Sequence, residues 1–136
     1  MKIDSIYIVD DDSITLFGLR KILQKLGNQT VIEEYRNGRD ALDALLFLQE
    51  NQMALPEIIF LDINMPIMDG WAFLEEFSQL PYTSKVHINI VTSSIDVRDR
   101  QKWKAYMKKT GHQIEFITKP IYELSLDRIV RLDMVS

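Results

Sequence analysis

Apolar residues along the chain fall into two alternating kinds of segment, short continuous runs and longer helical repeats. Residues 3–9 (IDSIYIV) are mostly apolar or β-branched and predict a strand, and the apolar residues that follow recur at helical spacing until Gly27. The same reading predicts further strands at 30–35, 56–62, 85–92 and 113–118, and helices at 37–51, about 70–79, 96–109 and from about 123. The run at 56–62 (PEIIFLD) is apolar almost throughout, which is typical of a strand covered by helices on both faces.

This alternation of strands and helices predicts the fold class. Five strand–helix units in 136 residues indicate one α/β domain, a doubly wound five-stranded parallel sheet with helices on both faces. His87 and Asn89 interrupt the apolar pattern of the fourth strand, and we interpret them as hydrogen-bonded polar residues of the core rather than as metal ligands.

The composition of the chain argues against several classes of function. A net charge of -4 argues against general nucleic-acid binding, and the absence of cysteine excludes disulfides, thiol nucleophiles and thiolate metal sites. The N-terminal apolar run is short and is broken by Asp4 and Asp10, so it predicts neither a signal peptide nor a membrane span. We therefore expect a cytoplasmic protein.

Polar residues follow four of the predicted strands at the point where each strand ends. They are Asp10, Asp11 and Asp12 after the first strand, Asp62 at the end of the third, Thr92, Ser93 and Ser94 at the end of the fourth, and Thr118 and Lys119 at the end of the fifth. A solvated turn that caps the helix near Ser13 would explain the aspartates of IVDDDSIT (8–15) taken alone. It would not explain why all four sets share one edge of the sheet, which is where parallel sheets bind ligands.

The polar residues at the strand ends can support only a few kinds of reaction. The carboxylates of Asp10, Asp11 and Asp62 offer the hard oxygen ligands that Mg²⁺ prefers, and a cation would relieve their mutual repulsion. Lys119 can hold an anion, and the Thr92 hydroxyl can hydrogen-bond the same anion. Together these groups suit phosphoryl transfer onto an aspartate, with an acyl phosphate as the product.

Four short motifs carry a resemblance that spans nearly the whole chain. They are VDDD at 9–12, LDINMPIMDG at 61–70, VTSS at 91–94 and ITKP at 117–120. In this order, at the ends of the first, third, fourth and fifth strands, they resemble the response-regulator receiver domains, the family of the chemotaxis regulator CheY. The resemblance implies the strand order 2-1-3-4-5 and a receiver domain over residues 1–136, with no separate output domain.

The resemblance also implies a metal site and a phosphoacceptor. Asp62 would accept the phosphoryl group, and Asp10 and Asp11 would bind Mg²⁺ directly or through water. Asn64 would give its backbone carbonyl to the metal, and Asp12 would be an additional acid in the loop.

The resemblance also implies which residues would respond to phosphorylation. Thr92 corresponds to the hydroxyl that follows the phosphoryl group, and Lys119 to the lysine that pairs with it. Phe116 stands where many members have a switching Tyr or Phe, and it lacks a hydroxyl. Ser93 departs from the Ala or Gly usual in the family and predicts crowding beside the phosphoryl group.

The implied function is that of a single-domain response regulator in a two-component system or phosphorelay, with Mg²⁺ as cofactor. A histidine kinase or phosphotransfer protein would phosphorylate Asp62, and the chain would catalyse only its own phosphorylation and dephosphorylation. The signal would reach a separate downstream protein, either through a switched surface or by passing the phosphoryl group on as a shuttle. Neither nucleic acid nor membrane is an expected partner.

Other functions remain open on the sequence alone. A haloacid-dehalogenase-like phosphatase would use Asp10 and Asp12, whose spacing fits, but the chain is short for its cap and the motif at 61–70 would go unexplained. A flavodoxin-like cofactor binder lacks the phosphate loop after the first strand. A receiver that only binds partners is a further alternative, against which the intact set of acidic, hydroxyl and lysine residues counts.

The predicted fourth helix has two interpretations. It carries six basic residues interleaved with Trp103, Tyr106 and Met107. It is either a solvated helix with its aromatic residues inward or part of a partner face, including a homodimer through the fourth helix and fifth strand.

Overall fold

A computed structural model describes residues 3–81, 85–94 and 96–119. Within these residues the strands are β1 (Ser5–Val9), β2 (Val31–Tyr35), β3 (Ile58–Leu61), β4 (His87–Thr92) and β5 (Gln113–Thr118). The helices are α1 (Ser13–Leu23), the 3₁₀ turn η1 (Gln24–Leu26), α2 (Gly38–Glu50), α3 (Gly70–Ser78) and α4 (Val97–Lys109). The helix predicted from about residue 123 lies outside the described residues.

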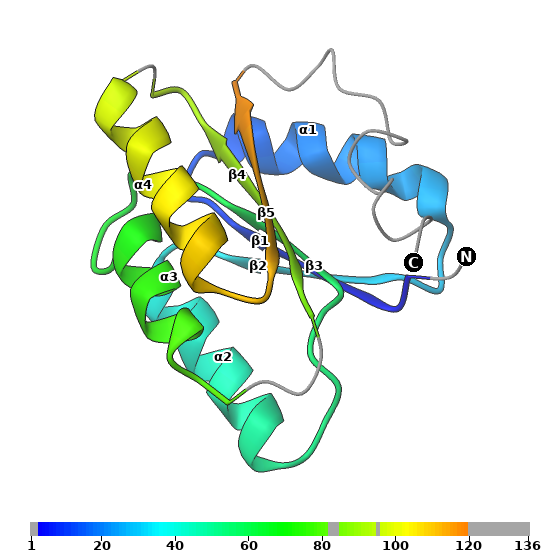
Figure 1. Ribbon diagram of the computed structural model, residues 1–136. Coiled ribbons are helices and arrows are strands. Elements are labelled where there is room, and N and C mark those ends of the chain that lie inside the picture. Colours follow the sequence, from blue (N-terminus) through cyan, green and yellow to red (C-terminus); the bar gives the residue numbers. More distant parts are fainter. Residues whose placement is uncertain (1–2, 82–84, 95, 120–136) are drawn as a thin grey trace.

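The five strands form one parallel sheet in the order β2-β1-β3-β4-β5. The predicted fold class and strand order are therefore confirmed. Figure 1 shows α1 on one side of this sheet and α2, α3 and α4 on the other. The order places β1 beside β3, so the residues that follow these two strands become neighbours at the carboxyl edge.

The sheet separates two apolar clusters. On the α1 side, Ile6, Ile8 and Phe60 of the strands pack with Leu19 and Leu23 of the helix. On the opposite side, Val9, Leu61 and Ile90 of the strands pack with Leu42 of α2 and Phe73 of α3. All four residues of β3 are buried, which confirms that helices cover both faces of this strand.

Each described α-helix begins at a polar residue whose side chain accepts a backbone N–H from the first turn. The capping residues are Asp12 for α1, Asn37 for α2, Asp69 for α3 and Asp96 for α4. Such caps satisfy donors that the helix cannot satisfy itself, so they fix where each helix starts. The turns at the carboxyl edge of the sheet are thereby held in place.

One expectation from the sequence, the end of the first helix, needs correction, and another, the hydrogen bonding of Asn89, is not confirmed. The first helix ends at Leu23, and its last predicted turn is the 3₁₀ segment, which Gly27 terminates with a φ of 97°. His87 and Asn89 are both buried in β4 as expected. However, the Asn89 amide makes no side-chain hydrogen bond within the described part of the chain, so the expected hydrogen bonding of Asn89 is not confirmed there.

None of the helices in the described ranges is long and apolar enough to cross a membrane.

Candidate functional site

Three carboxylates meet where β1 and β3 end. Asp10 and Asp62 are 2% and 6% exposed, whereas Asp11 is exposed. The sheet ladder extends to the first two, because the Asp10 N–H donates to Tyr35 and the Asp62 N–H to Val9, both at 2.9 Å. Each of the three aspartates offers a carboxylate oxygen, and these oxygens all lie within 4.8 Å of one another. The structure thus brings together the three aspartates that the sequence predicted as a cluster.

Lys119, directly after β5, reaches the same point. Its Nζ lies 3.2 Å from Oδ2 of Asp10 and 3.6 Å from Oδ2 of Asp62, and its side chain is only 15% exposed. Its backbone N–H donates to the Thr92 carbonyl at 2.7 Å, which ties the end of β5 to the end of β4. The predicted lysine is therefore part of the cluster.

The two buried carboxylates use their oxygens in the same way. Oδ1 of Asp10 accepts the N–H of Asp12, and Oδ1 of Asp62 accepts the N–H of Ile63, both at 2.8 Å. In each residue Oδ2 is the oxygen that faces Lys119. The backbone thus fixes one oxygen of Asp62 and leaves the other toward the ammonium.

The cluster holds negative charge at an energetic cost. The pKa of Asp10 is raised to about 6, mainly by burial; the N–H of Asp12 and the charge of Lys119 act against this rise, and the charge of Asp62 adds to it. Burial also raises the pKa of Asp62, while the charge of Lys119 and the N–H of Ile63 act in the opposite direction. Hard oxygen ligands that repel one another fit Mg²⁺, because a divalent cation stabilises their charged forms.

Asp12 has a different role from its two neighbours. Its carboxylate caps α1, accepting the Ile14 N–H at 3.1 Å and the Thr15 hydroxyl at 2.8 Å, and the hydrogen bond from Thr15 is the main cause of its lowered pKa. It is nevertheless 3.8 Å from the Lys119 ammonium. The helix-cap explanation that the sequence offered for the acidic run is thus correct for Asp12, which lies at the rim of the cluster.

The loop between β3 and α3 is held tightly beneath Asp62. A Cβ placed on Gly70 would lie 2.3 Å from the Asp62 carbonyl oxygen, and the Gly70 N–H donates to Ile63 at 2.8 Å, so only glycine fits here. Ile67 has a φ of 68°, which is uncommon for a β-branched residue, in a turn closed by the Met68 N–H on the Pro66 carbonyl. Asn64 is exposed in this loop, two residues after Asp62.

Thr92 is fully buried at the end of β4. Its Oγ1 accepts the backbone N–H of Ser94 at 3.2 Å, and Ser93 is exposed beside it. The predicted hydroxyl is therefore present at the carboxyl edge and is engaged by the following loop.

Phe116 is partly buried on the α4 side of β5. Its ring centroid lies 5.6 Å from that of Trp103, and the Arg100 guanidinium lies 5.0 Å over the ring. Phe116 is therefore packed between the strand and α4 and is not among the residues that meet at the carboxylates.

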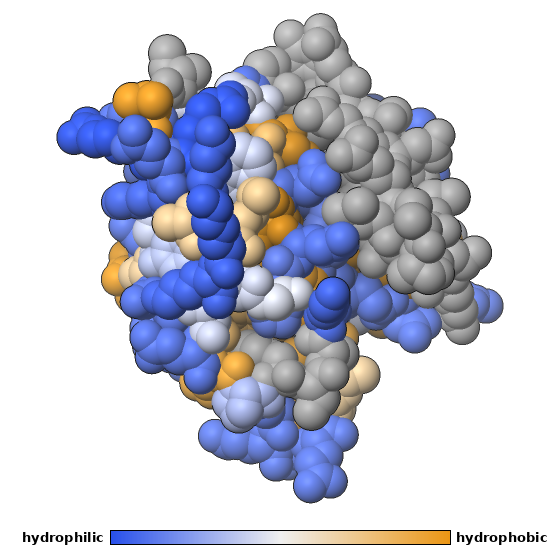
Figure 2. Space-filling view, viewed as in Figure 1, coloured by the Kyte–Doolittle hydropathy of each residue, from blue (hydrophilic) through white to orange (hydrophobic). Residues whose placement is uncertain are grey.

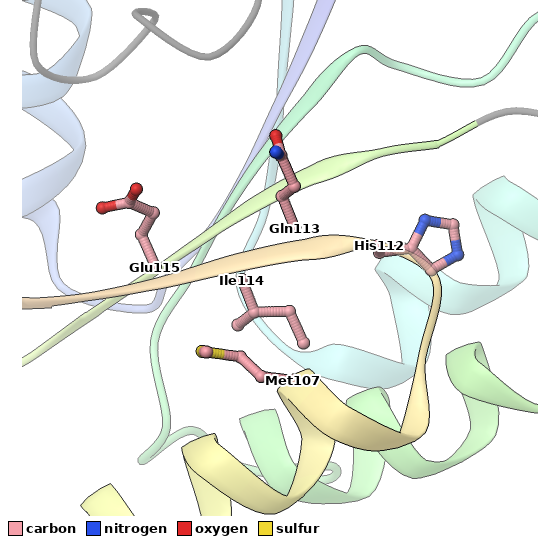
Figure 3. Close-up of a pocket in the computed structure, with 5 residues that line it drawn as sticks. All are labelled: Met107, His112, Gln113, Ile114 and Glu115. Atoms are coloured by element: carbon pink, nitrogen blue, oxygen red, sulfur yellow. The ribbon is translucent and has the colours of Figure 1, made fainter.

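A surface pocket lies between α4 and β5, away from the carboxylates. Figure 3 shows Ile114 of β5 pointing toward Met107 of α4, with Gln113 and Glu115 on the other side of the strand and His112 on the turn. The lining holds no cluster of carboxylates or nucleophiles, so the pocket is not a candidate for the phosphoryl chemistry.

Sequence reasoning missed the residues that join α3 to the loop after β4. Trp71, Ser94 and Asp99 form a hydrogen-bonded chain there. From the sequence alone, Trp71 would be expected in the core and Asp99 on the surface of a basic helix. Nothing in their spacing signals the contact, because it depends on how two separate helices pack.

Comparison with known proteins agrees with this geometry. Residues 6–131 match the family model described as the response regulator receiver domain. The protein PilH of Pseudomonas aeruginosa is 31% identical over 121 residues, which cover 89% of this chain and 89% of PilH. Other relatives are longer: the chain spans 29% of a protein-glutamate methylesterase/protein-glutamine glutaminase of Archaeoglobus fulgidus, to which it is 32% identical over 85% of its own length.

Solved structures agree on the fold. A two-component response regulator from Cytophaga hutchinsonii, 28% identical, superposes with a TM-score of 0.80 over 100% of both chains. The Mn²⁺-bound form of the response regulator Rcp1, 21% identical, has a TM-score of 0.68 over 95% of this chain and 88% of its own, and shares the fold.

Proposed function

This chain belongs to the family of response regulator receiver domains, and on that premise we propose that Asp62 is its phosphoacceptor. Receiver domains are signalling switches of two-component and phosphorelay systems. The observation that carries the assignment is that Oδ2 of Asp62, buried at the carboxyl edge of the sheet, faces the Lys119 ammonium at 3.6 Å while Oδ1 is held by the backbone.

Asp10, Asp11 and Asp62 are the residues that would hold Mg²⁺, with the backbone carbonyl of Asn64 as a further ligand. Their convergent oxygens and the raised pKa of Asp10 support this ligand set. When bound, the metal supplies positive charge that compensates the phosphoryl oxygens.

The chain's own residues account for the remaining chemistry. Oδ2 of Asp62 attacks the phosphorus of the donor, a new O–P bond forms, and the bond from phosphorus to the donor's leaving group breaks with its electron pair departing on that group. Lys119 pairs with the added negative charge, and the Thr92 hydroxyl donates to a phosphoryl oxygen. The product is an acyl phosphate on Asp62.

The phosphoryl donor that we propose is a histidine kinase or a phosphotransfer protein. The downstream target that the signal reaches is a separate protein. Phosphorylation would alter the surface of α4 and β5 through Thr92 and Phe116, and this surface would contact the downstream partner or a second copy of the chain. Figure 2 shows that the molecular surface over α4 is largely hydrophilic, with smaller hydrophobic areas beside it. None of the residues of α4 is buried. A phosphoryl shuttle is the alternative output, and the cytoplasmic location stays a prediction.

The geometry disfavours a phosphatase that would use Asp10 as nucleophile and Asp12 as acid. The Asp12 carboxylate is occupied by the first turn of α1, through the Ile14 N–H and the Thr15 hydroxyl. A general acid needs its proton free to reach a leaving group, and hydrogen bonds to the charged form hold the Asp12 carboxyl ionised.

Incubation with phosphoramidate and Mg²⁺ tests the proposal. We expect the intact mass to increase by one phosphoryl group, and Asp62→Asn to prevent the increase. Asp43→Asn, which removes an exposed carboxylate on α2, should leave it unchanged. A protein that gains no phosphoryl group, or an Asp62→Asn variant that gains it as readily as the wild type, would overturn the proposal.

A further inference from the structure

The carboxylate of Asp99 joins two parts of the molecule that are far apart in the sequence. Its Oδ1 accepts the indole N–H of Trp71, from the first turn of α3, at 3.0 Å. Its Oδ2 accepts the hydroxyl of Ser94, from the loop between β4 and α4. One carboxylate, in the first turn of α4, thus holds a helix and a loop with its two oxygens.

The Ser94 end of this bridge leads to Thr92. The Ser94 N–H donates to Oγ1 of Thr92 at 3.2 Å, while the Ser94 hydroxyl also accepts the N–H of Asp96 at 3.2 Å. Ser94 is therefore fixed through its backbone and its side chain. Because Oγ1 of Thr92 accepts the Ser94 N–H, the hydroxyl can shift only if Ser94 follows it or the hydrogen bond breaks.

The Trp71 end is anchored firmly. Trp71 is 8% exposed, and its ring stacks on that of Tyr106 with centroids 5.9 Å apart and an interplanar angle of 10°. It directly follows Gly70, which packs against the backbone of Asp62. The bridge thus runs from the backbone beside the phosphoacceptor, through Trp71 and Asp99, to the loop that holds Thr92.

We propose that Asp99 and Ser94 are positioning residues that form a latch, holding the Thr92 hydroxyl in the place it occupies when Asp62 carries no phosphoryl group. The inference rests on the proposed function of Asp62 and Thr92. Binding of a phosphoryl group draws the Thr92 hydroxyl toward Asp62 and must work against the latch. Releasing the latch therefore shifts the two-state equilibrium toward the phosphorylated arrangement.

A second link between α3 and α4 offers a matched control. The Lys109 ammonium lies 2.7 Å from Oε2 of Glu75. This ion pair joins the same two helices, but neither residue contacts Ser94 or Thr92 in any hydrogen bond of the described chain. Its loss removes a helix–helix contact without releasing the loop.

Titration with beryllofluoride in the presence of Mg²⁺ tests the latch, because beryllofluoride stands in for the phosphoryl group on an aspartate. We expect Ser94→Ala and Asp99→Ala to bind it at least about fivefold more tightly than the wild type, the lower end of ordinary coupling between sites. Ser94→Thr, which keeps a hydroxyl, and Lys109→Ala should bind it as the wild type does. Equal or weaker binding by both alanine variants overturns the proposal.

A measurement without Mg²⁺ distinguishes a failure of the latch proposal from a failure of the proposed function. In the protein without Mg²⁺, hydrogen exchange of the Trp71 indole N–H should accelerate at least about tenfold in Asp99→Ala and not in Lys109→Ala. Unchanged exchange in Asp99→Ala overturns the latch. If instead the wild type fails to bind beryllofluoride while indole exchange behaves as expected, the proposed function fails and the bridge stands. If Asp99→Ala does not fold, the beryllofluoride titration of Ser94→Ala alone decides: tighter binding than the wild type supports the latch, and equal or weaker binding overturns it.

Discussion

Lys119 holds its ammonium 3.2 Å from Oδ2 of Asp10, a carboxylate that is 2% exposed and lies beside the proposed phosphoacceptor. Lys119 therefore compensates buried negative charge at this point of the described chain. We expect the same ammonium to pair with a phosphoryl group on Asp62, and therefore to act in opposite directions on the two proposed events: it would compete with Mg²⁺ and would assist phosphorylation.

Replacing Lys119 should separate these two effects. We expect Lys119→Met to bind Mg²⁺ more tightly, because a competing positive charge is removed, and yet to be phosphorylated by phosphoramidate about 100-fold more slowly. Isothermal titration and the time course of the intact mass measure the two quantities. Lys25→Met, at an exposed lysine in the 3₁₀ turn after α1, is the control. Parallel losses of metal binding and phosphorylation would contradict the assigned role of Lys119.

Removing the charge of Asp10 should stabilise the metal-free protein. Its pKa is raised from 3.8 to about 6 in the folded state, so the folded protein holds the proton more tightly than the unfolded chain, and stability is lost as the pH rises through this interval. At pH 7, Asp10→Asn should therefore raise the free energy of unfolding by about 1–3 kcal/mol. Urea denaturation measures the change, with Asp43→Asn as an exposed control. An Asp10→Asn variant less stable than the wild type would refute the prediction.

Stabilisation by Mg²⁺ should depend on pH. The proposed ligands would bind the metal in their charged forms, and burial raises the pKa of both Asp10 and Asp62. The rise in Tm caused by a fixed Mg²⁺ concentration should therefore be large at pH 7.5 and small at pH 5.5. Thermal unfolding with and without Mg²⁺ gives the values. A rise in Tm that is equal at the two pH values would show that these carboxylates do not hold the metal.

Gly70 should tolerate no side chain. A Cβ there would lie 2.3 Å from the Asp62 carbonyl oxygen, whereas a Cβ on Gly111 meets nothing within 4 Å. We expect Gly70→Ala to lower the free energy of unfolding by about 1–3 kcal/mol and to slow phosphorylation, because the backbone of Asp62 must move. Gly111→Ala should change stability by less than about 1 kcal/mol. Similar stabilities for the two variants would contradict the packing described here.

The sequence predicted the sheet well because apolar runs and helical repeats are local patterns. β3 could be recognised as a buried central strand from its own residues, and the carboxyl-edge rule brought Asp10, Asp62 and Lys119 together before any contact was known. The first helix was predicted to continue to Leu26, because apolar periodicity does not distinguish an α-helix from a final 3₁₀ turn.

Other features depend on packing between elements. The bridge from Trp71 through Asp99 to Ser94 needs α3 and α4 side by side, and no motif encodes that. Asp12 also illustrates the limit: three consecutive aspartates look equivalent in the sequence, yet one caps a helix and two supply carboxylates to the cluster. Only the backbone geometry after β1 distinguishes them.

The most direct test of the central claim is to locate the phosphoryl group after reaction with phosphoramidate and Mg²⁺. Borohydride reduces an aspartyl phosphate to homoserine and so marks the residue permanently before proteolysis and peptide mass spectrometry. We predict that the mark lies on Asp62, in the segment that links β3 to α3. A mark on Asp10 or Asp11, or a phosphoryl group that stays bound to a hydroxyl residue such as Thr92 or Ser93, would contradict the account.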